Sequence, residues 1–205
     1  SEMQNRIVGV EINKQACEVL RHKVEAKLRD AGFNSKEVTQ LCDAWLVQGD
    51  FLSTTFKHPF THVIGNPPYL RLEALPRELM QYYRQQFSTM YDRSDLYVAF
   101  FEKGLSLLSP GGKLGYICSD RWMKNKYGGP LRKWIAERYH LETYVDFSGC
   151  EAFHSEVSAY PAVTIICNGK TGPTRIVRKN EVTLSTLSGL AEALTSEQND
   201  IRVEK

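Results

Sequence analysis

The sequence lacks several features that mark particular classes of protein. None of its five cysteines stands in a Cys-x-x-Cys pair, and an odd number of scattered cysteines indicates free thiols in a reducing cytosol, not a disulfide framework or zinc site. No apolar run is long enough to span a bilayer, and the first residues show no signal-peptide pattern. The formal net charge is only +2, so bulk charge does not mark a nucleic-acid-binding protein. We therefore expect a cytoplasmic protein with no membrane contact and no metal, in which affinity for nucleic acid comes from local patches.

Apolar and polar residues alternate in segments that are typical of an α/β protein. The 205 residues are 42% hydrophobic and 24% charged, enough for a sizeable core. Short apolar runs predict strands, and apolar residues at four-residue spacing predict helices between them. The predicted strands span residues 6–12, 45–51, 61–69, 113–119, 141–147 and 159–167, with a turn at 109–112 and helices beginning near Asn13, Ser35, Pro76, Asp95 and Gly129. This alternation favours a layered fold with a mostly parallel sheet.

Three polar residues stand where predicted strands end. Glu11, Asp50 and Asn66 each follow an apolar run. Ligands of open α/β sheets bind beyond the carboxyl ends of the strands. Asn66 also opens the Asn-Pro-Pro-Tyr turn at 66–69, in which two prolines end strand pairing and stiffen the backbone. Such a turn can be purely structural, but its position among the other strand ends predicts a ligand site.

The acids at 11 and 50 together with the turn at 66–69 resemble S-adenosylmethionine-dependent N6-adenine DNA methyltransferases, of the gamma class found in restriction–modification systems. The resemblance continues through SDLYVAFFEKGLSLLSPGGKLGYICSDRWMKNKYGGPLRKWI and VDFSGCEAFHSEVSAYPAVTII, so that it covers residues 6–168. It implies a Rossmann-like class I methyltransferase fold, α/β, with a mostly parallel sheet and one antiparallel strand. It also implies an enzyme that methylates adenine site-specifically, with S-adenosylmethionine as cofactor and double-stranded DNA with a flipped adenine as partner.

The resemblance gives the turn a catalytic role that suits its chemistry. The exocyclic amine of adenine is a poor nucleophile because its lone pair is delocalised into the ring. The side-chain carbonyl of Asn66 and the backbone carbonyl of Pro67 would accept from its two N–H groups and stabilise the positive charge that develops as the methyl arrives. Pro68 keeps the backbone stiff, and Tyr69 would stack on the base, which must leave the duplex to react.

The cofactor would be held by residues at the first two strand ends. The resemblance implies that Glu11 accepts from both ribose hydroxyls and Asp50 from the adenine amine, with Ile12 and Phe51 as apolar walls. Each acid also has an ordinary alternative. Glu11 can be a favourable charge at a helix N-terminus, and Gly-Asp-Phe at 49–51 can be a solvated turn.

Substrate contacts are predicted in two later segments. Phe153 matches the family's second aromatic, which would pack on the flipped base opposite Tyr69; Tyr160 is the rival, and core packing is the alternative for both. Arg121 and Lys124 open a basic stretch, up to residue 133, that includes two aromatic residues and follows a strand end. This stretch would contact DNA phosphates, although a merely solvated face is an equal alternative.

The sequence departs from the family in one respect. Family members begin with a strand and a glycine-rich loop that cradles the methionine part of the cofactor, whereas no Gly-x-Gly occurs here and only ten residues precede Glu11. We expect this chain to be a piece of a larger methyltransferase. Residues 1–180 would form a partial catalytic domain without its central first strand, and residues 181–205 would lead towards an absent target-recognition region. The parent chain could also carry a nuclease domain. The piece alone should bind cofactor weakly or not at all and be inactive. Either a gap should separate the first strand from the strand before Asn66, or a partner element should fill that place.

Two other functions fit the same residues. A methyltransferase of RNA bases or of a protein glutamine would also present a planar amine or amide to the Asn-Pro-Pro-Tyr turn. A non-catalytic module that binds DNA or supports an assembly would explain the absent glycine-rich loop. The long stretches at 94–135 favour the DNA enzymes, and the intact turn at 66–69 argues against the non-catalytic module.

Overall fold

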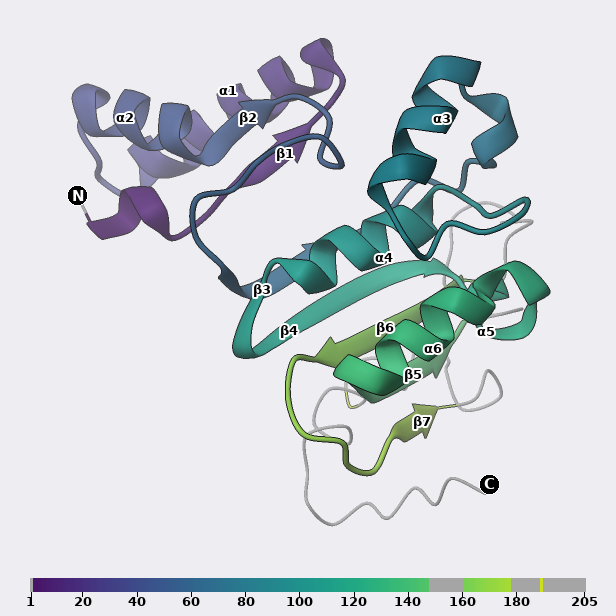
Figure 1. Ribbon diagram of the computed structural model, residues 1–205. Coiled ribbons are helices and arrows are strands. Elements are labelled where there is room, and N and C mark those ends of the chain that lie inside the picture. Colours follow the sequence, from purple (N-terminus) through teal and green to yellow (C-terminus); the bar gives the residue numbers. More distant parts are fainter. Residues whose placement is uncertain (1, 148–160, 178–188, 190–205) are drawn as a thin grey trace. The chain divides into compact units, whose positions relative to one another are not determined.

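The computed structural model of the chain describes residues 2–147, 161–177 and 189 (Figure 1). The chain divides into two compact units, an N-terminal unit (Ser1–Thr55) and a C-terminal unit (Phe56–Lys205). Each unit has its own sheet and its own cluster of buried side chains. The described residues therefore form two sheets, one of two strands and one of five.

The N-terminal unit is a small parallel β-α-α-β arrangement. Its elements are η1 (Glu2–Asn5), β1 (Gly9–Glu11), α1 (Lys14–Asp30), α2 (Ser35–Trp45) and β2 (Leu46–Gln48). Each helix begins after an asparagine that caps it: the side chain of Asn13 accepts from the backbone N–H of Ala16 at 2.9 Å, and Asn34 forms a reciprocal capping box with Glu37. The two helices bury a core made of Leu28, Val38, Leu41, Cys42 and Trp45.

The C-terminal unit holds the larger, mixed sheet. Its elements are β3 (Phe60–Gly65), η2 (Leu72–Ala74), α3 (Arg77–Gln86), α4 (Tyr97–Ser106), β4 (Leu108–Ser119), α5 (Arg121–Lys124), η3 (Lys126–Gly128), α6 (Gly129–Arg138), β5 (His140–Asp146), β6 (Pro161–Cys167) and β7 (Arg175–Val177). The strand order is β3-β4-β6-β5-β7, in which β6 runs antiparallel to both neighbours and the other pairs are parallel. The predicted α/β fold, with a mostly parallel sheet and one antiparallel strand, is confirmed.

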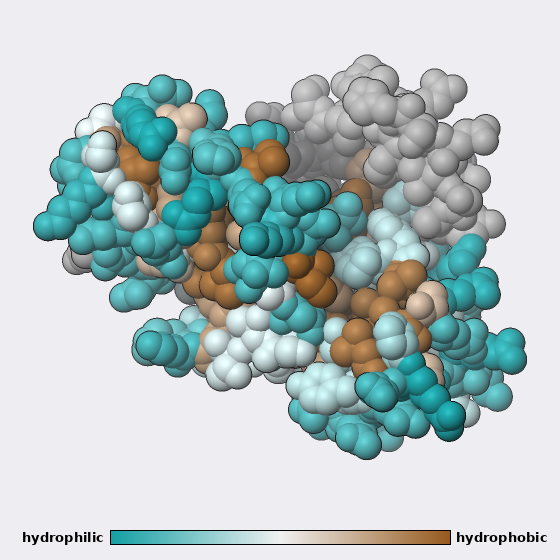
Figure 2. Space-filling model, turned by 90° about the horizontal axis from the view of Figure 1, so that it is seen from above, coloured by the Kyte–Doolittle hydropathy of each residue, from teal (hydrophilic) through white to brown (hydrophobic). Residues whose placement is uncertain are grey.

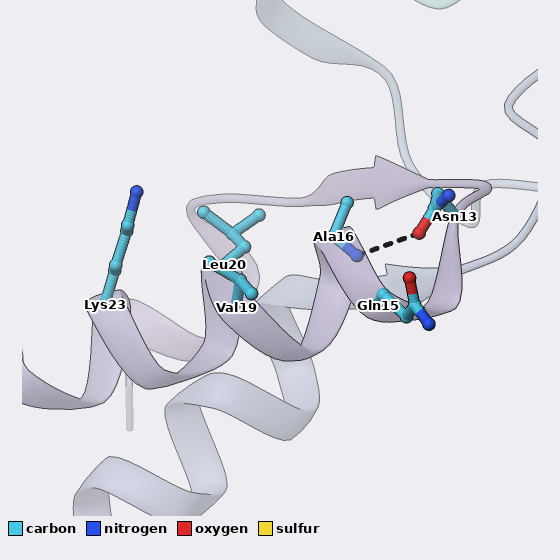
Figure 3. Close-up of a pocket in the computed structure, with 6 residues that line it drawn as sticks. All are labelled: Asn13, Gln15, Ala16, Val19, Leu20 and Lys23. Carbon is cyan, nitrogen blue, oxygen red and sulfur yellow. Dashed lines mark hydrogen bonds between the residues drawn. The ribbon is translucent and has the colours of Figure 1, made fainter.

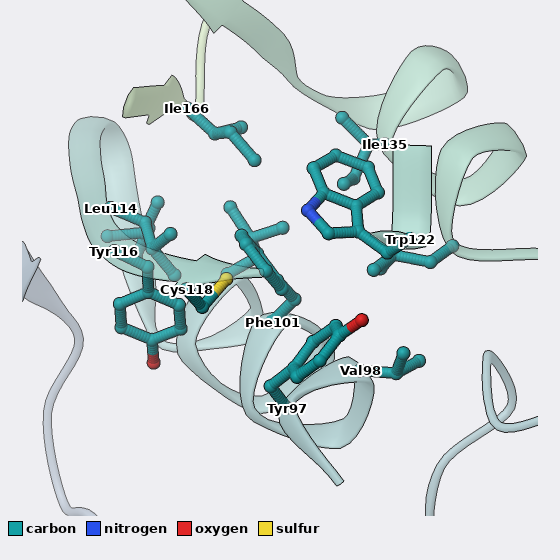
Figure 4. Close-up of a cluster of buried hydrophobic side chains, with 12 residues drawn as sticks. Tyr97, Val98, Phe101, Leu114, Tyr116, Cys118, Trp122, Ile135 and Ile166 are labelled. Carbon is teal, nitrogen blue, oxygen red and sulfur yellow. The ribbon is translucent and has the colours of Figure 1, made fainter. Parts of the chain in front are cut away.

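An aromatic core joins the helices α4 and α6 to the sheet. Tyr97 and Phe101 of α4 pack with Tyr116 of β4 and Trp122 of α5, and the rings of Phe101 and Trp122 lie 5.0 Å apart (Figure 4). Gly104 lets α4 approach β4 closely, because a Cβ at this position would collide with the ring of Tyr116. Buried aromatic pairs of this kind contribute more than their area alone. The end of β4 therefore lies on a well-packed core, and Val63 of β3 packs against the same cluster.

The structure differs from the sequence prediction at residues 109–112. They were expected to form a turn before a strand that begins at 113, but they lie within β4, as an irregular stretch between the pairings of Phe60 with Leu108 and of His62 with Lys113. The physical reason is Asn168, at the end of β6. Its backbone N–H donates to Gly112, its carbonyl accepts from Gly111, and its side chain donates to Leu108 and Ser109. These bonds hold the glycine-rich stretch in the sheet.

Hydrophilic side chains cover most of the described surface on the face drawn in Figure 2, and hydrophobic ones gather in patches. Among the described residues, large hydrophobic side chains that stand exposed include Ile12, Val19 and Leu20 in the N-terminal unit and Ile64 and Tyr69 in the C-terminal unit. Within the part of the chain that the structure describes, none of the helices has the length and apolar character that a membrane crossing needs.

Candidate active site

The first two predicted cofactor residues lie at one edge of the small sheet. β1 and β2 are parallel, and their register sets Glu11 opposite Gln48, two residues before Asp50. The backbone N–H of Gly49 donates to the carbonyl of Glu11 at 2.9 Å, which ties the two strand ends together. The structure thus brings Glu11 and Asp50 to the same edge, as the sequence predicts.

The two carboxylates also cap their own backbones. Oε1 of Glu11 accepts from the N–H of Asn13 at 2.7 Å. The oxygens of Asp50 accept from the N–H of Leu52 at 2.9 Å and from the N–H and hydroxyl of Ser53 at 3.2 and 2.5 Å. The ordinary role of each acid, helix entry for Glu11 and turn formation for Asp50, is therefore present. A carboxylate offers about four acceptor sites, so the bond from Asn13 leaves Glu11 capacity for a ligand.

The predicted apolar walls differ in exposure. Ile12 has 66% of its side chain exposed, directly after Glu11, whereas Phe51 is half-buried. An isoleucine this exposed at a strand end can cover a planar ring. A shallow pocket begins beside it, along the open side of α1 (Figure 3), and does not include the two acids; its lining residues are Asn13, Gln15, Ala16, Val19, Leu20 and Lys23.

The Asn-Pro-Pro-Tyr turn begins directly after β3 in the C-terminal unit. β3 ends at Gly65, which pairs with Tyr116 of the parallel strand β4, so the turn leaves at the carboxyl edge of the five-stranded sheet. Asn66 is exposed and therefore accessible from solvent, whereas Pro67, which follows it, is buried.

Tyr69 stands partly in solvent and partly against β4. Its side chain is 42% exposed, and burial, with a smaller contribution from negative charge on Cys118, raises the pKa of its phenol to about 12. Cys118 lies near the end of β4, and burial raises the pKa of its thiol as well. Tyr69 is thus neutral at neutral pH and partly accessible from solvent.

The two predicted phosphate contacts lie in α5, which follows β4 at the same sheet edge. The ammonium of Lys124 forms an ion pair with Asp120, whose side chain is 1% exposed and which also accepts from the hydroxyl of Tyr144 at 3.2 Å. Arg121, the other predicted contact, is half-buried. Lys124 itself is 62% exposed, so its charge reaches the surface although it is paired.

Sequence reasoning missed the groups that support α5. Trp122 belongs to the core and is not a surface aromatic of a basic loop. The spacing of Asp120 and Lys124, four residues apart, is a visible signal for a helical ion pair, but nothing in the sequence shows that Asp120 is buried. Phe153 and Tyr160 lie outside the described residues, so their predicted role at the base stays a prediction.

Residues 5–153 match the model of the Eco57I restriction-modification methylase family. Among curated proteins, the chain is 47% identical over 95% of its length to the type II methyltransferase M.PaeR7I of Pseudomonas aeruginosa, and 42% identical over 92% to M.XhoI of Xanthomonas vasicola. It covers 34% and 35% of these two proteins, about a third of their length.

Solved structures of similar fold are methyltransferases and restriction–modification proteins. A Listeria monocytogenes protein described as a class I S-adenosylmethionine-dependent methyltransferase has a TM-score of 0.64 at 15% identity, over 91% of this chain and 54% of that one. The M protein of the type I restriction enzyme EcoKI has a TM-score of 0.62 at 14% sequence identity, and the match covers 91% of this chain and 40% of that one. DrdV, solved as a complex with DNA, has a TM-score of 0.59 at 14% sequence identity, and the match covers 99% of this chain and 24% of that one. The fold is that of the class I methyltransferases, and the chain belongs to the Eco57I restriction-modification methylase family.

Proposed function

We propose that the protein of which this chain is a part transfers a methyl group from S-adenosylmethionine to the N6 amine of adenine in double-stranded DNA, as the modification enzyme of a restriction–modification or related defence system. The observation that carries this proposal is the turn at 66–69, which leaves the carboxyl edge of the sheet with Asn66 exposed and Pro67 buried. Membership of a methylase family and the methyltransferase names of the relatives support it.

The residues of the turn are suited to hold and activate an exocyclic amine. The carbonyl oxygens of Asn66 and Pro67 would each accept from one N–H of the amine, which draws the nitrogen towards a tetrahedral geometry and frees its lone pair. Fixed acceptors also stabilise the positive charge that appears on the nitrogen during transfer. Tyr69, neutral and partly exposed, would stack on the extrahelical base.

The carboxylates and the exposed isoleucine of the N-terminal unit fit the nucleoside part of the cofactor. Glu11 would accept from the two ribose hydroxyls and Asp50 from the adenine amine, and the exposed Ile12 offers an apolar surface for the ring. S-adenosylmethionine would supply an electrophilic methyl group on its sulfonium. Arg121 and Lys124 would contact DNA phosphates, which in the case of Lys124 requires sharing its charge with Asp120.

The test is a methyl-transfer assay of the full-length protein with labelled S-adenosylmethionine and three substrates: duplex DNA, RNA and protein. We expect label in DNA, recovered as N6-methyladenine after digestion to nucleosides. Label recovered as N4-methylcytosine would contradict the choice of base, and label in RNA or in protein glutamine would contradict the choice of substrate. No transfer to any of the three, with a folded protein and bound cofactor, would support a non-catalytic module.

A further inference from the structure

The segment that follows the Asn-Pro-Pro-Tyr turn is bound to the segment that precedes α4. The backbone N–H of Leu96 donates to the carbonyl of Leu70 at 2.8 Å, and the N–H of Leu72 donates to the carbonyl of Ser94 at 3.2 Å. Arg71 and Asp95 form an antiparallel bridge between these two bonds. The backbone thus leaves the turn along a fixed path, one residue after Tyr69.

A chain of side-chain hydrogen bonds continues from this bridge. The hydroxyl of Tyr127, in η3, donates to Oδ2 of Asp95 at 2.7 Å and lies 2.6 Å from the hydroxyl of Tyr97, in α4. Tyr97 is buried, and Asp95 and Tyr127 are half-buried. Burial raises the pKa of both phenols, so both keep their protons well above neutral pH. Both hydroxyls can therefore act as hydrogen-bond donors at neutral pH.

The segment that carries Tyr127 is itself held tightly. Gly128 lies against the carbonyl of Trp122, where any Cβ would overlap that oxygen. The guanidinium of Arg132 donates to the same carbonyl at 2.5 Å and to the carbonyl of Asn125 at 2.9 Å. Because Trp122 belongs to the aromatic core, the hydroxyl of Tyr127 has a defined position relative to the sheet.

We propose that Tyr127 and Asp95 are positioning residues for the turn at 66–69: their hydrogen bond fixes the backbone that leaves the turn and so keeps the acceptors of Asn66 and Pro67 in the geometry that the amine requires. The proposal rests on the function proposed above. Catalytic groups need a supporting layer of this kind, because a displacement of about 1 Å far from the chemistry can lower a rate by about a hundredfold. Neither residue touches the substrate in this account.

The test compares four variants of the full-length protein in single-turnover methyl transfer at saturating DNA and cofactor. Tyr127→Phe removes only the hydroxyl that donates to Asp95, and Asp95→Ala removes the acceptor. Asp95→Asn keeps an acceptor oxygen. Tyr139→Phe is the matched control, because Tyr139 is also half-buried in the C-terminal unit and its hydroxyl makes no hydrogen bond to the described residues.

We expect Tyr127→Phe and Asp95→Ala to lower the transfer rate by about tenfold to a hundredfold, with KM for S-adenosylmethionine and the Kd for DNA unchanged. Asp95→Asn should recover most of the rate of the unaltered protein, and Tyr139→Phe should match it. Circular dichroism at the assay temperature checks that each variant is folded, so a lost rate reports the turn and not unfolding.

Three results would overturn the proposal. A normal rate for Tyr127→Phe would show that the hydrogen bond has no part in catalysis. Equal losses of transfer rate in Asp95→Asn and Asp95→Ala would show that the charge of Asp95 matters and not its hydrogen bond. A loss of transfer rate in Tyr139→Phe as large as in Tyr127→Phe would show a general effect on the fold. In each of these cases Asn66→Ala would still be inactive and the proposed function would stand, whereas an active Asn66→Ala variant would overturn both.

Discussion

The two units of the chain hold their candidate residues in different ways. In the C-terminal unit, the turn at 66–69 follows a six-residue strand that is paired to a twelve-residue one, above an aromatic core. In the N-terminal unit, Glu11 ends one strand of three residues and Asp50 follows another, and the core is a small cluster of side chains from the two helices. The residues proposed for chemistry thus lie on a larger sheet and core, and those proposed for cofactor binding on a smaller one.

This difference has a physical rationale. An acceptor that acts in a transition state must be placed accurately, because preorganisation is what makes it effective. A residue that binds a ligand can adjust when the ligand arrives, at a modest cost in ordering free energy. Substitutions in the C-terminal unit should therefore affect rate, and those in the N-terminal unit should affect cofactor affinity.

Asn66→Ala gives the largest expected effect and tests the catalytic side of the comparison. Removing one preorganised acceptor should lower the methyl-transfer rate of the full-length protein by about a hundredfold or more. The affinity for S-adenosylmethionine, measured by calorimetry, should be nearly unchanged, because Asn66 is proposed to act on the target amine. A variant with near-normal turnover would remove the assignment of Asn66, and a variant that instead lost cofactor affinity would break the division of roles between the units.

Tyr69→Ala should weaken capture of the extrahelical base by about 1–3 kcal/mol, the value of stacking one base on an aromatic ring. A duplex with 2-aminopurine at the target position should show less fluorescence increase with the variant than with the unaltered protein. Binding of unmodified duplex should change much less. Tyr69→Phe, which keeps the ring, is the matched control, and equal fluorescence for Tyr69→Ala and Tyr69→Phe would make Tyr69 a structural residue.

Glu11→Gln tests the cofactor side and should have a smaller effect. A hydrogen bond to a charged acceptor contributes about 1.5–3 kcal/mol, so replacing the carboxylate by an amide should weaken S-adenosylmethionine binding by about tenfold. The amide oxygen can still accept from the N–H of Asn13, which preserves the entry to α1. The transfer rate at saturating cofactor should stay close to normal. Glu18→Gln, at an exposed position on α1, is the control, and equal affinities in the two variants would leave Glu11 only its helix-capping role.

Local features of the fold and of the candidate site could be predicted from the sequence, whereas contacts between distant residues could not. The helix that begins after Asn13 and the strand ends at Glu11 and before Asn66 follow from local patterns, and the structure has them where they are expected. The hydrogen bond between Tyr127 and Asp95 joins residues far apart in the sequence, and no local pattern marks it. Trp122 illustrates the same limit, because alternation of basic and aromatic residues does not tell which side chain turns inward.

Alkaline pH should lower the stability of the two units to different extents, because their ionisable groups differ. At ordinary pH this difference in stability should be small. All ten tyrosines of the chain follow residue 68. In the described part of the chain, those whose pKa burial raises include Tyr69, Tyr97, Tyr116, Tyr127, Tyr139 and Tyr144.

The sign of the effect follows from the direction of these shifts. In an unfolded chain a tyrosine loses its proton near pH 10, whereas the folded C-terminal unit holds these protons more tightly. The stability that they contribute is therefore fully present below about pH 10 and is lost as the pH rises through the pKa values of the folded state, which for Tyr69 is about 12.

In the N-terminal unit the corresponding group is the buried thiol of Cys42, whose pKa is also raised. We expect the C-terminal unit to lose more stability than the N-terminal unit above pH 10. Fluorine NMR of the 205-residue chain labelled with fluorotryptophan would follow Trp45 in one unit and Trp122 and Trp134 in the other, and an earlier alkaline transition at Trp45 than at Trp122 would contradict the prediction.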